Sequence, residues 1–286
     1  MKGEHGVEVL CAVLEVSRSG FYRWDSSPPS SRQREDEALA AHIVRSHYES
    51  RGNYGAPRVC EDLKAQGIRT SKRRCARLMS EYNLRGRKKS GKRPRTTDSQ
   101  HAHPPAPNLL HRSEPSSGPN QVWITDITYL PTGEGWLFLA AIIDLWSRKV
   151  VGWACGPTLH ASLVLAALAK ARRNRQPPAG LYHHSDRGVQ YACGEYRQAL
   201  LAAGMICSMS RKGNCYDNAA MESFWSTLKT ETGLDQTTPI SRRAAELIVF
   251  DYIETFYNPK RRHSSLGYIS PVAFEKQATK NHIKAA

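Results

Sequence analysis

Residues 121–231 alternate apolar runs of strand length with longer runs of helical periodicity, and this alternation limits the folds open to the chain. Three strand-like runs come first, joined by the turn-forming segments PTGE and SR: QVWITDITYL, GWLFLAAIIDLW and KVVGWACG. Helix-like and strand-like segments then alternate: ASLVLAALAKARRN, LYHHS, GEYRQALLAAG, ICSMS and DNAAMESFWSTLKTE. A meander of strands followed by such alternation predicts a mixed sheet with helices on both faces, an α/β core.

The chain ahead of this core has helical periodicity. In GAPRVCEDLKAQG and SKRRCARLMSEYNL, apolar residues recur at three- and four-residue intervals, the two segments are separated by a short GIRTS turn, and Ser71 is placed as an N-cap. This spacing predicts a helix-turn-helix. The exposed face of its second helix would carry four cations, as a helix that reads a DNA groove does: Lys72, Arg73, Arg74 and Arg77. A solvated helical hairpin fits the periodicity equally well.

Positive charge extends from this helix into a segment rich in proline and serine. Residues 69–95 hold twelve Lys or Arg against a single acid, Glu81, and the whole chain has a formal charge of +15. Such an excess favours polyanions, with nucleic acid as the first candidate and an anionic membrane surface as the second. We therefore expect DNA contacts also in the linker, at Arg87, Lys88 and Lys89.

Other function classes receive no support from the sequence. The apolar run at 136–144 is far shorter than the ~20 residues that span a bilayer, and the N-terminus lacks the apolar core of a signal peptide. Seven scattered cysteines without a CxxC pair indicate neither a disulfide framework nor a zinc finger. We expect a cytoplasmic protein without membrane contact.

Two aspartates lie where carboxylates need an explanation. Strand alternation puts Asp126 on the same face as Ile124 and Leu130, and burying an ionised carboxylate is costly unless cations or hydrogen bonds compensate. Asp186 follows the short strand LYHHS, and the carboxyl ends of strands are where ligands of α/β sheets lie. An Asx-turn is the simpler explanation for Asp186 taken alone.

The third acid lies on the last helix of the core. At 100° per residue, Ala220, Phe224 and Leu228 form an apolar stripe, and Glu222 lies on the opposite side of the helix. Lys229 falls within about 20° of Glu222. An ordinary solvated face would show the same pattern.

Two aspartates and one glutamate suit a particular chemistry. Mg²⁺ binds through a few carboxylates together with substrate phosphate. Two such ions, roughly 3.5–4 Å apart, can stabilise the attacking and leaving oxygens of a phosphoryl displacement.

The motifs WITDITY, HHSDRGVQY and NCYDNAAMESFWSTLK, with thirty-five residues between Asp186 and Glu222, closely resemble the catalytic blocks of the DDE transposases of bacterial insertion sequences. The resemblance is to the downstream-frame protein of the family whose transposase comes from two overlapping reading frames, and it extends to retroviral integrase cores. It covers nearly the whole chain, through LEVSRSGFYRW, YGAPRV, IIDLWSRKVVGW and YNPKRRHSSLGYISPVAF.

The resemblance implies an RNase H-like catalytic core and a DNA transposase or integrase that nicks 3′ ends and joins the freed hydroxyl to another phosphodiester. By motif position, Asp126, Asp186 and Glu222 would ligate Mg²⁺ or Mn²⁺, in two ions, and Lys229 would contact DNA near the transposon end. Asp144 would be structural, and Asp217 and Asn218 would start the Glu222 helix. The partners would be insertion-sequence ends, target DNA, further copies of the chain on DNA and the upstream-frame protein.

The sequence thus predicts an all-α helix-turn-helix region at 1–84, a basic linker at 85–119, an RNase H-like core with a helical C-terminal extension at 120–278 and a tail at 279–286. A catalytically silent DNA-binding regulator or accessory factor of transposition is the alternative function. It would carry the same basic helix-turn-helix but would bind DNA without turnover.

Overall fold

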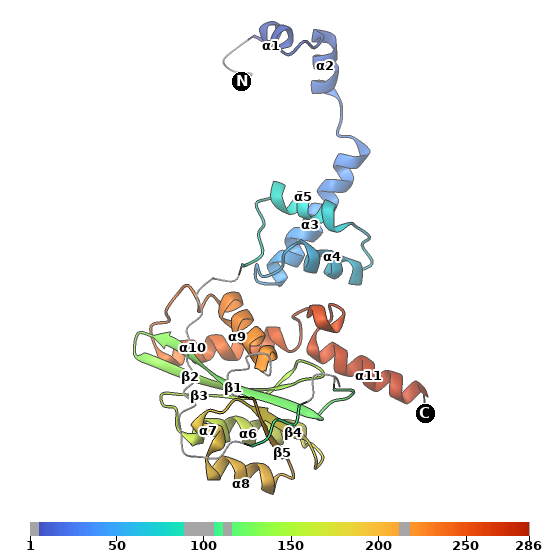
Figure 1. Ribbon diagram of the computed structural model, residues 1–286. Coiled ribbons are helices and arrows are strands. Elements are labelled where there is room, and N and C mark those ends of the chain that lie inside the picture. The colour runs from blue at the N-terminus through green and yellow to red at the C-terminus, as the bar shows by residue number, and fades with distance from the viewer. Residues whose placement is uncertain (1–5, 89–105, 111–115, 212–217, 286) are drawn as a thin grey trace. The chain divides into compact units, whose positions relative to one another are not determined.

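The computed structural model describes residues 6–88, 106–110, 116–211 and 218–285. The chain forms two compact units, Met1–Gly86 and Arg87–Ala286, each considered by itself below. The described helices of the first unit, coloured blue to cyan in Figure 1, are α1 (Val7–Val13), α2 (Arg18–Ser26), α3 (Ser31–Glu49), α4 (Ala56–Ala65) and α5 (Lys72–Glu81).

The core of the first unit lies between α3, α4 and α5. Ile43, Val59 and Leu63 are at most 1% exposed, and Cys75 and Leu78 meet them from α5. The side chain of Ser71 accepts a hydrogen bond from the backbone N–H of Arg74, so the predicted N-cap is confirmed. The apolar periodicity in the sequence therefore corresponds to one buried face on each of α4 and α5.

The second unit contains, in its described part, one five-stranded sheet with the strand order β3-β2-β1-β4-β5. β1 pairs antiparallel with β2 and parallel with β4, β2 pairs antiparallel with β3, and β4 pairs parallel with β5. This is the mixed sheet that the alternation predicts. The strands are β1 (Val122–Thr132), β2 (Gly135–Asp144), β3 (Val150–Gly156), β4 (Tyr182–Ser185) and β5 (Ile206–Met209).

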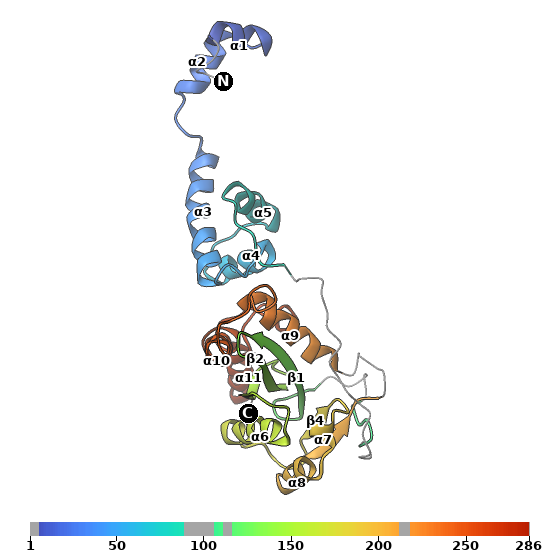
Figure 2. The same cartoon turned by 90° about the vertical axis from the view of Figure 1, so that its left-hand side faces the viewer.

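Helices cover both faces of this sheet, as Figures 1 and 2 show. Trp123 and Ile142 share one core cluster with residues of α6, α7 and α8. Trp225 of α9 instead reaches Asp126 on the opposite face. Odd-numbered residues at the start of β1 thus face one helical layer and even-numbered residues face the other. The helices are α6 (Ala161–Arg175), α7 (Val189–Ala192), α8 (Gly194–Ala202), α9 (Ala219–Thr232), α10 (Arg242–Phe250), the π-helix η2 (Asp251–Tyr257), the 3-10 helix η3 (Ser264–Leu266) and α11 (Pro271–Ala285).

Part of the predicted linker packs against this second unit. The backbone N–H of Met209 donates to the carbonyl of Pro107, and the N–H of Leu109 donates to Ser208 Oγ. Ala106 also packs against the core cluster. Residues 106–110 therefore run along β5, the edge strand, and occupy some of the groups that an uncovered edge would leave unpaired.

Asp144 is a structural residue in this fold, as expected. Its side chain is 1% exposed and accepts hydrogen bonds from the backbone N–H groups of Asn120, Trp146 and Ser147, so its oxygens hold together the turn that follows β2. Arg175 approaches the same carboxylate at 3.6 Å.

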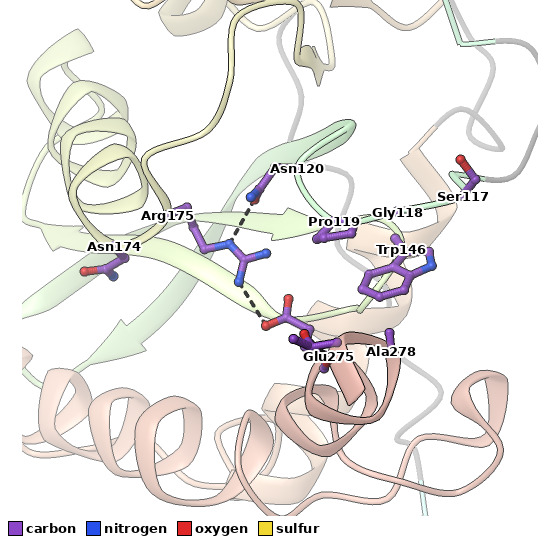
Figure 3. Close-up of a pocket in the computed structure, with 10 residues that line it drawn as sticks. Ser117, Gly118, Pro119, Asn120, Trp146, Asn174, Arg175, Glu275 and Ala278 are labelled. Atoms are coloured by element: carbon purple, nitrogen blue, oxygen red, sulfur yellow. Dashed lines mark hydrogen bonds and ion pairs between the residues drawn. The ribbon is translucent and has the colours of Figure 1, made fainter. Parts of the chain in front are cut away.

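The helix α11 is fastened to the sheet by Glu275, which Figure 3 shows beside Arg175. Glu275 Oε2 lies 2.9 Å from Arg175 Nη1 and 3.0 Å from Lys149 Nζ. Burial opposes ionisation of Glu275, but the hydrogen bonds and charges of Arg175 and Lys149 outweigh it and hold the pKa of that carboxyl below its ordinary value. The rings of Trp146 and Phe274 add a contact at 4.7 Å between centroids.

Replacing Glu275 by glutamine is expected to reduce stability in a pH-dependent way. A carboxyl whose pKa is lower in the folded state stabilises the fold above its unfolded pKa, and this contribution is lost as the pH falls through the folded value. The variant should therefore lose about 1.5 kcal/mol at pH 7, the size of a charge-assisted hydrogen bond. The difference from the unaltered protein should vanish well below pH 4, as measured by urea unfolding at each pH.

Glu246→Gln is the matched control, because Glu246 forms an ion pair with Arg243 within α10 that is largely open to solvent. Exposed pairs contribute little. A loss of stability in Glu275→Gln that stays constant from pH 7 to pH 3 would show that packing, and not the charge, holds α11.

Among the described residues, no helix is long and apolar enough to cross a membrane.

Candidate active site

The strand register brings Asp126 and Asp186 together. β1 and β4 run parallel with Val122 opposite Tyr182 and Ile124 opposite His184. Asp126 and Asp186 each follow the last of these pairs by two residues, and the charge of Asp186 acts on Asp126. Neighbouring strands lie about 4.8 Å apart, so the two aspartates leave adjacent positions on the same edge of the pairing. The sheet therefore places these two carboxylates side by side, although sixty residues separate them in the sequence.

Asp126 is held in a defined orientation and resists ionisation. Its Oδ1 accepts the backbone N–H of Ile127 at 2.9 Å, and its Oδ2 accepts the indole N–H of Trp225 at 3.0 Å. Burial, the negative charge of Asp186 and, to a lesser extent, that of Glu222 raise the pKa of Asp126 to about 7, against the effect of the two hydrogen bonds. A cation at this place would relieve the repulsion among the carboxylates.

Asp186 lies in the Ser-Asp-Arg-Gly loop after β4. Its Oδ1 accepts the backbone N–H of Gly188 at 2.9 Å, so the Asx-turn considered from the sequence is present. A Cβ atom at position 188 would lie 3.0 Å from that oxygen, closer than nearly all such contacts. Asp186 can therefore form the Asx-turn and still lie near Asp126, because the turn uses only one of its carboxylate oxygens and fixes the direction of the other.

α9 presents Glu222, Trp225 and Lys229 toward this region from one arc of about 60°. Trp225 contacts Asp126 directly, while Glu222 is exposed on the first turn of the helix. Buried Met221, Phe224 and Leu228 anchor the adjoining side of the helix. The predicted stripe is thus largely correct, with Ala220 half-buried.

Lys229 lies within the electrostatic reach of Asp126 and Asp235. Burial lowers the pKa of its ammonium group, and the nearby negative charges of Asp126 and Asp235 oppose that shift. Its side chain is half-buried. The ammonium group of Lys229 has three N–H donors, and such a cation forms charge-assisted hydrogen bonds with phosphate oxygens.

The three acids do not form a ready metal cage. No group of three His, Cys, Asp or Glu side chains within the described ranges lies close enough to hold a metal ion. The charges of Asp186 and Glu222 act on Asp126, but carboxylates repel one another unless a cation lies between them. The donor set nevertheless fits Mg²⁺, since all three ligands would be carboxylate oxygens, one of them on β1 and one in the loop that follows the neighbouring β4.

Two residues near the site escaped the sequence interpretation. The hydroxyl of Tyr191, from α7, lies 3.2 Å from Thr125 Oγ1, and burial with the charges of Asp126 and Asp186 raises the pKa of this phenol well above its ordinary value. The second residue is Trp225. In the motifs of Tyr191 and Trp225 the aromatic residue has the spacing of core packing, so no sequence signal marks the phenol hydroxyl or the indole N–H.

Asn218 is the N-cap residue of α9, but its side chain makes no capping hydrogen bond, and its Oδ1 is buried without a partner among the described residues. Asn218 therefore stands at the start of the helix as expected, but its side chain does not form the capping hydrogen bond that was expected to start it. Asp217 lies outside the described residues.

The cations predicted to contact DNA divide into two groups. Arg74 and Arg77 form ion pairs with Asp36 of α3, with Arg74 Nε 2.7 Å from Asp36 Oδ1. Lys72 and Arg73 are exposed. The expected exposure thus holds for Arg77 as well, but Arg74 is half-buried, and both arginines are paired with an acid of α3, thirty-eight residues before Arg74.

The linker cations also differ from the simple picture of solvated charges. Arg87 belongs to the second unit and donates from Nη1 to the carbonyl of Thr230 at 3.2 Å, near the carboxyl end of α9, where cations are favoured. Lys88 is exposed, and Lys89 lies outside the described residues.

Comparison with protein families gives the class of this fold and site. Two family models described as "Integrase core domain" match residues 116–215 and 203–271, and one described as "HTH-like domain" matches residues 33–92. The second unit therefore contains an integrase core domain, and a helix-turn-helix-like region precedes it.

Comparison with curated relatives narrows this class to a family. An "Insertion element IS600 uncharacterized 31 kDa protein" from Shigella sonnei is 47% identical over 94% of this chain and 98% of its own length. The "Transposase InsF for insertion sequence IS3A" from Escherichia coli (strain K12) is 40% identical over 96% of each chain. The chain belongs to the IS3 family of insertion-sequence transposases.

Solved structures with a similar fold come from retroviral integrases. The simian T-cell lymphotropic virus intasome in complex with PP2A regulatory subunit B56 gamma aligns with 82% of this chain and 74% of its own at 14% identity and a TM-score of 0.46. The HTLV-2 integrase catalytic core domain in complex with magnesium aligns with 59% of this chain and 99% of its own, at 15% identity and a TM-score of 0.42.

Proposed function

We propose that this transposase cleaves DNA at insertion-sequence ends and joins the freed strand to target DNA by metal-dependent phosphoryl transfer, with Asp126, Asp186 and Glu222 as the metal ligands. The observation that carries the proposal is the parallel register of β1 and β4, whose last pair, Ile124 and His184, is followed two residues later on each strand by Asp126 and Asp186. The hydrogen bond from Trp225 then brings the helix of Glu222 to the same carboxylates.

Mg²⁺ or Mn²⁺, bound as two ions, would supply the positive charge that stabilises the attacking and leaving oxygens at phosphorus. The residues of the chain provide the rest. Asp126 and Asp186 offer rigid oxygens, because backbone N–H groups of Ile127 and Gly188 fix their carboxylates. Glu222, exposed on the first turn of α9, would offer the third carboxylate.

Lys229 would bind the DNA phosphate next to the reacting one. Its ammonium already lies in the field of Asp126, so a phosphate held there lies next to the carboxylates. Because water or a DNA 3′-hydroxyl is the nucleophile, no covalent bond between protein and DNA is formed in this reaction.

One experiment separates this enzyme from the alternative, a catalytically silent DNA-binding regulator. The purified protein is incubated with end-labelled terminal DNA of its insertion sequence in Mg²⁺, in Mn²⁺ or in EDTA. Shortened and joined products in the metal lanes alone are expected. Binding without product in every lane would favour the regulator, and a protein covalently linked to DNA would favour a recombinase with a nucleophilic Tyr or Ser.

The first unit is proposed to bind the insertion-sequence ends through exposed cations. Replacing Lys72 and Arg73 together by alanine is expected to weaken DNA binding and to flatten its salt dependence. Each lost phosphate contact removes about 0.9 from the slope of log affinity against log salt, so the slope should fall by about 1.8. Fluorescence anisotropy over a salt series gives this slope.

Arg45→Ala is the control for this prediction, because Arg45 is exposed on α3 of the same unit and is paired with Glu49. It should leave the slope unchanged. An unchanged slope in the double variant would remove α5 from the DNA interface.

The partners of the proposed reaction follow from its chemistry. Cutting two ends and joining them to a target requires several active sites, so we propose assembly of further copies on DNA in the cytoplasm. The upstream-frame protein of the insertion sequence is a further proposed partner, for recognition of the ends.

A further inference from the structure

We propose that Trp225 is a positioning residue for the metal-binding carboxylate of Asp126, an inference that rests on the proposed function. Its indole Nε1 donates to Asp126 Oδ2 at 3.0 Å, and the side chain is only 7% exposed. The contact joins α9 to the centre of β1 across ninety-nine residues of sequence.

The geometry of the carboxylate supports this role. Asp126 Oδ1 already accepts the N–H of Ile127, which by itself leaves the carboxylate free to rotate about that bond. The second hydrogen bond, on Oδ2, fixes its plane, and each carboxylate oxygen keeps a further lone pair for a cation. Hydrogen bonds of this kind to a metal-binding carboxylate orient it and raise metal affinity.

The placement of Trp225 on α9 gives the hydrogen bond a second effect. Glu222 lies three residues before it, close to one helical turn, so a fixed Trp225 also fixes the height of Glu222 above the sheet. The ring of Trp225 lies 4.9 Å from that of Phe224, whose side chain is buried in the core. Packing in the core thus holds the indole of Trp225 in place, and the fixed Trp225 in turn holds Glu222 one helical turn away.

Two other buried tryptophans of the second unit provide a comparison for this contact. Trp123 lies on the same strand as Asp126, and its Nε1 is buried without a partner among the described residues. Trp153 donates to Glu254 at 2.8 Å, on β3 and η2. Trp153 therefore offers a matched control, a buried indole donor to a carboxylate that is not one of the proposed ligands.

The test measures Mg²⁺ binding and does not depend on activity. The melting temperature of the metal-free full chain is followed over a series of Mg²⁺ concentrations at constant ionic strength, because a ligand of the folded state raises it in proportion to ln(1 + [L]/Kd). The proteins are the unaltered chain, Trp225→Phe, Trp153→Phe and Asp126→Asn. Phenylalanine keeps an aromatic ring but removes the N–H.

Trp225→Phe is expected to require about tenfold more Mg²⁺ for the same rise, the usual cost of losing an outer hydrogen bond to a ligand. Trp153→Phe should match the unaltered chain, and Asp126→Asn should show no rise. Equal Mg²⁺ dependence in Trp225→Phe and the unaltered chain would overturn the positioning role and leave the proposed function standing. No rise in the unaltered chain would overturn the metal site itself.

A second replacement covers the case in which Trp225→Phe does not fold. 3-Benzothienylalanine at position 225 exchanges only the indole N–H for sulfur and preserves the two-ring shape. The same tenfold loss of Mg²⁺ affinity is expected for it. Retained affinity would contradict the proposal, because the packing would be intact and only the hydrogen bond absent.

Discussion

Replacing Glu222 by glutamine is expected to abolish DNA cleavage and strand joining in Mg²⁺ while leaving DNA binding intact. The amide keeps the shape of the side chain but supplies a far weaker metal ligand than a carboxylate. Loss of about 4 kcal/mol of transition-state stabilisation corresponds to a rate about a thousandfold lower. Single-turnover cleavage of labelled end DNA gives the rate, and anisotropy gives the affinity.

The position of Glu222 in the structure allows this substitution to be made without disturbing the packing of α9. Glu222 is exposed and lies opposite the stripe that anchors α9, so its loss should not disturb the fold. Glu195→Gln, on the exposed side of α8, is the matched control and should cleave DNA at the normal rate. Cleavage by Glu222→Gln within tenfold of the unaltered protein would exclude Glu222 as a ligand.

The largest loss of stability is expected from Arg261→Met. The Arg261 guanidinium binds both carboxylate oxygens of Glu231 at 2.7 Å, and the two side chains are 4% and 7% exposed. Burial opposes the charge of Arg261, yet Glu231 keeps its pKa above the ordinary value. Removing one partner of such a buried pair leaves an uncompensated charge and costs about 3–5 kcal/mol. Calorimetry of the full chain measures the loss.

Removing both partners is the control. The double variant Arg261→Met with Glu231→Leu replaces the ion pair by apolar side chains of similar volume and should recover most of the lost stability. Tyr252, whose hydroxyl donates to Glu231 at 2.8 Å, would then lose its acceptor, so the recovery should be incomplete. A double variant less stable than Arg261→Met would contradict this account.

The pair also bears on the active site, because Glu231 is the penultimate residue of α9. It holds the carboxyl end of the helix against the π-helix η2 and the segment after it, while Trp225 holds the middle. Glu222, near the other end, is thus carried on a helix with two fixed points. Loss of the Glu231–Arg261 pair should therefore displace Glu222 as well as destabilise the fold.

The sheet and its order of helices could be predicted from the sequence because each strand carries its own signal. β1 and β2 are apolar runs separated by a turn, and the even-numbered side chains of β1 face α9 as alternation requires. The neighbourhood of Asp126 and Asp186 follows from the parallel pairing, which was expected from the family resemblance and not from spacing alone.

What could not be predicted depends on contacts between distant segments. Helical periodicity correctly predicts the exposure of Lys72, Arg73 and Arg77. It does not predict that Arg74 and Arg77 pair with Asp36, because nothing in the local sequence reveals that partner. Arg261 stands in a polar stretch of the sequence that resembles a surface loop, and only the fold buries it on Glu231. Composition likewise marked residues 106–110 as linker although they pair with β5.

The long ladder of paired residues between β1 and β2 determines which codon deletions inactivate a copy of the insertion sequence. Ten consecutive residue pairs lock β1 in place, so the chain cannot slide to absorb the loss of a codon between Val122 and Asp126. Such an in-frame deletion would turn the aspartate toward the opposite helical layer. A deletion of equal length in the Pro177–Gly180 connection would spare the alignment, so single-codon losses should inactivate or spare a copy according to where they fall.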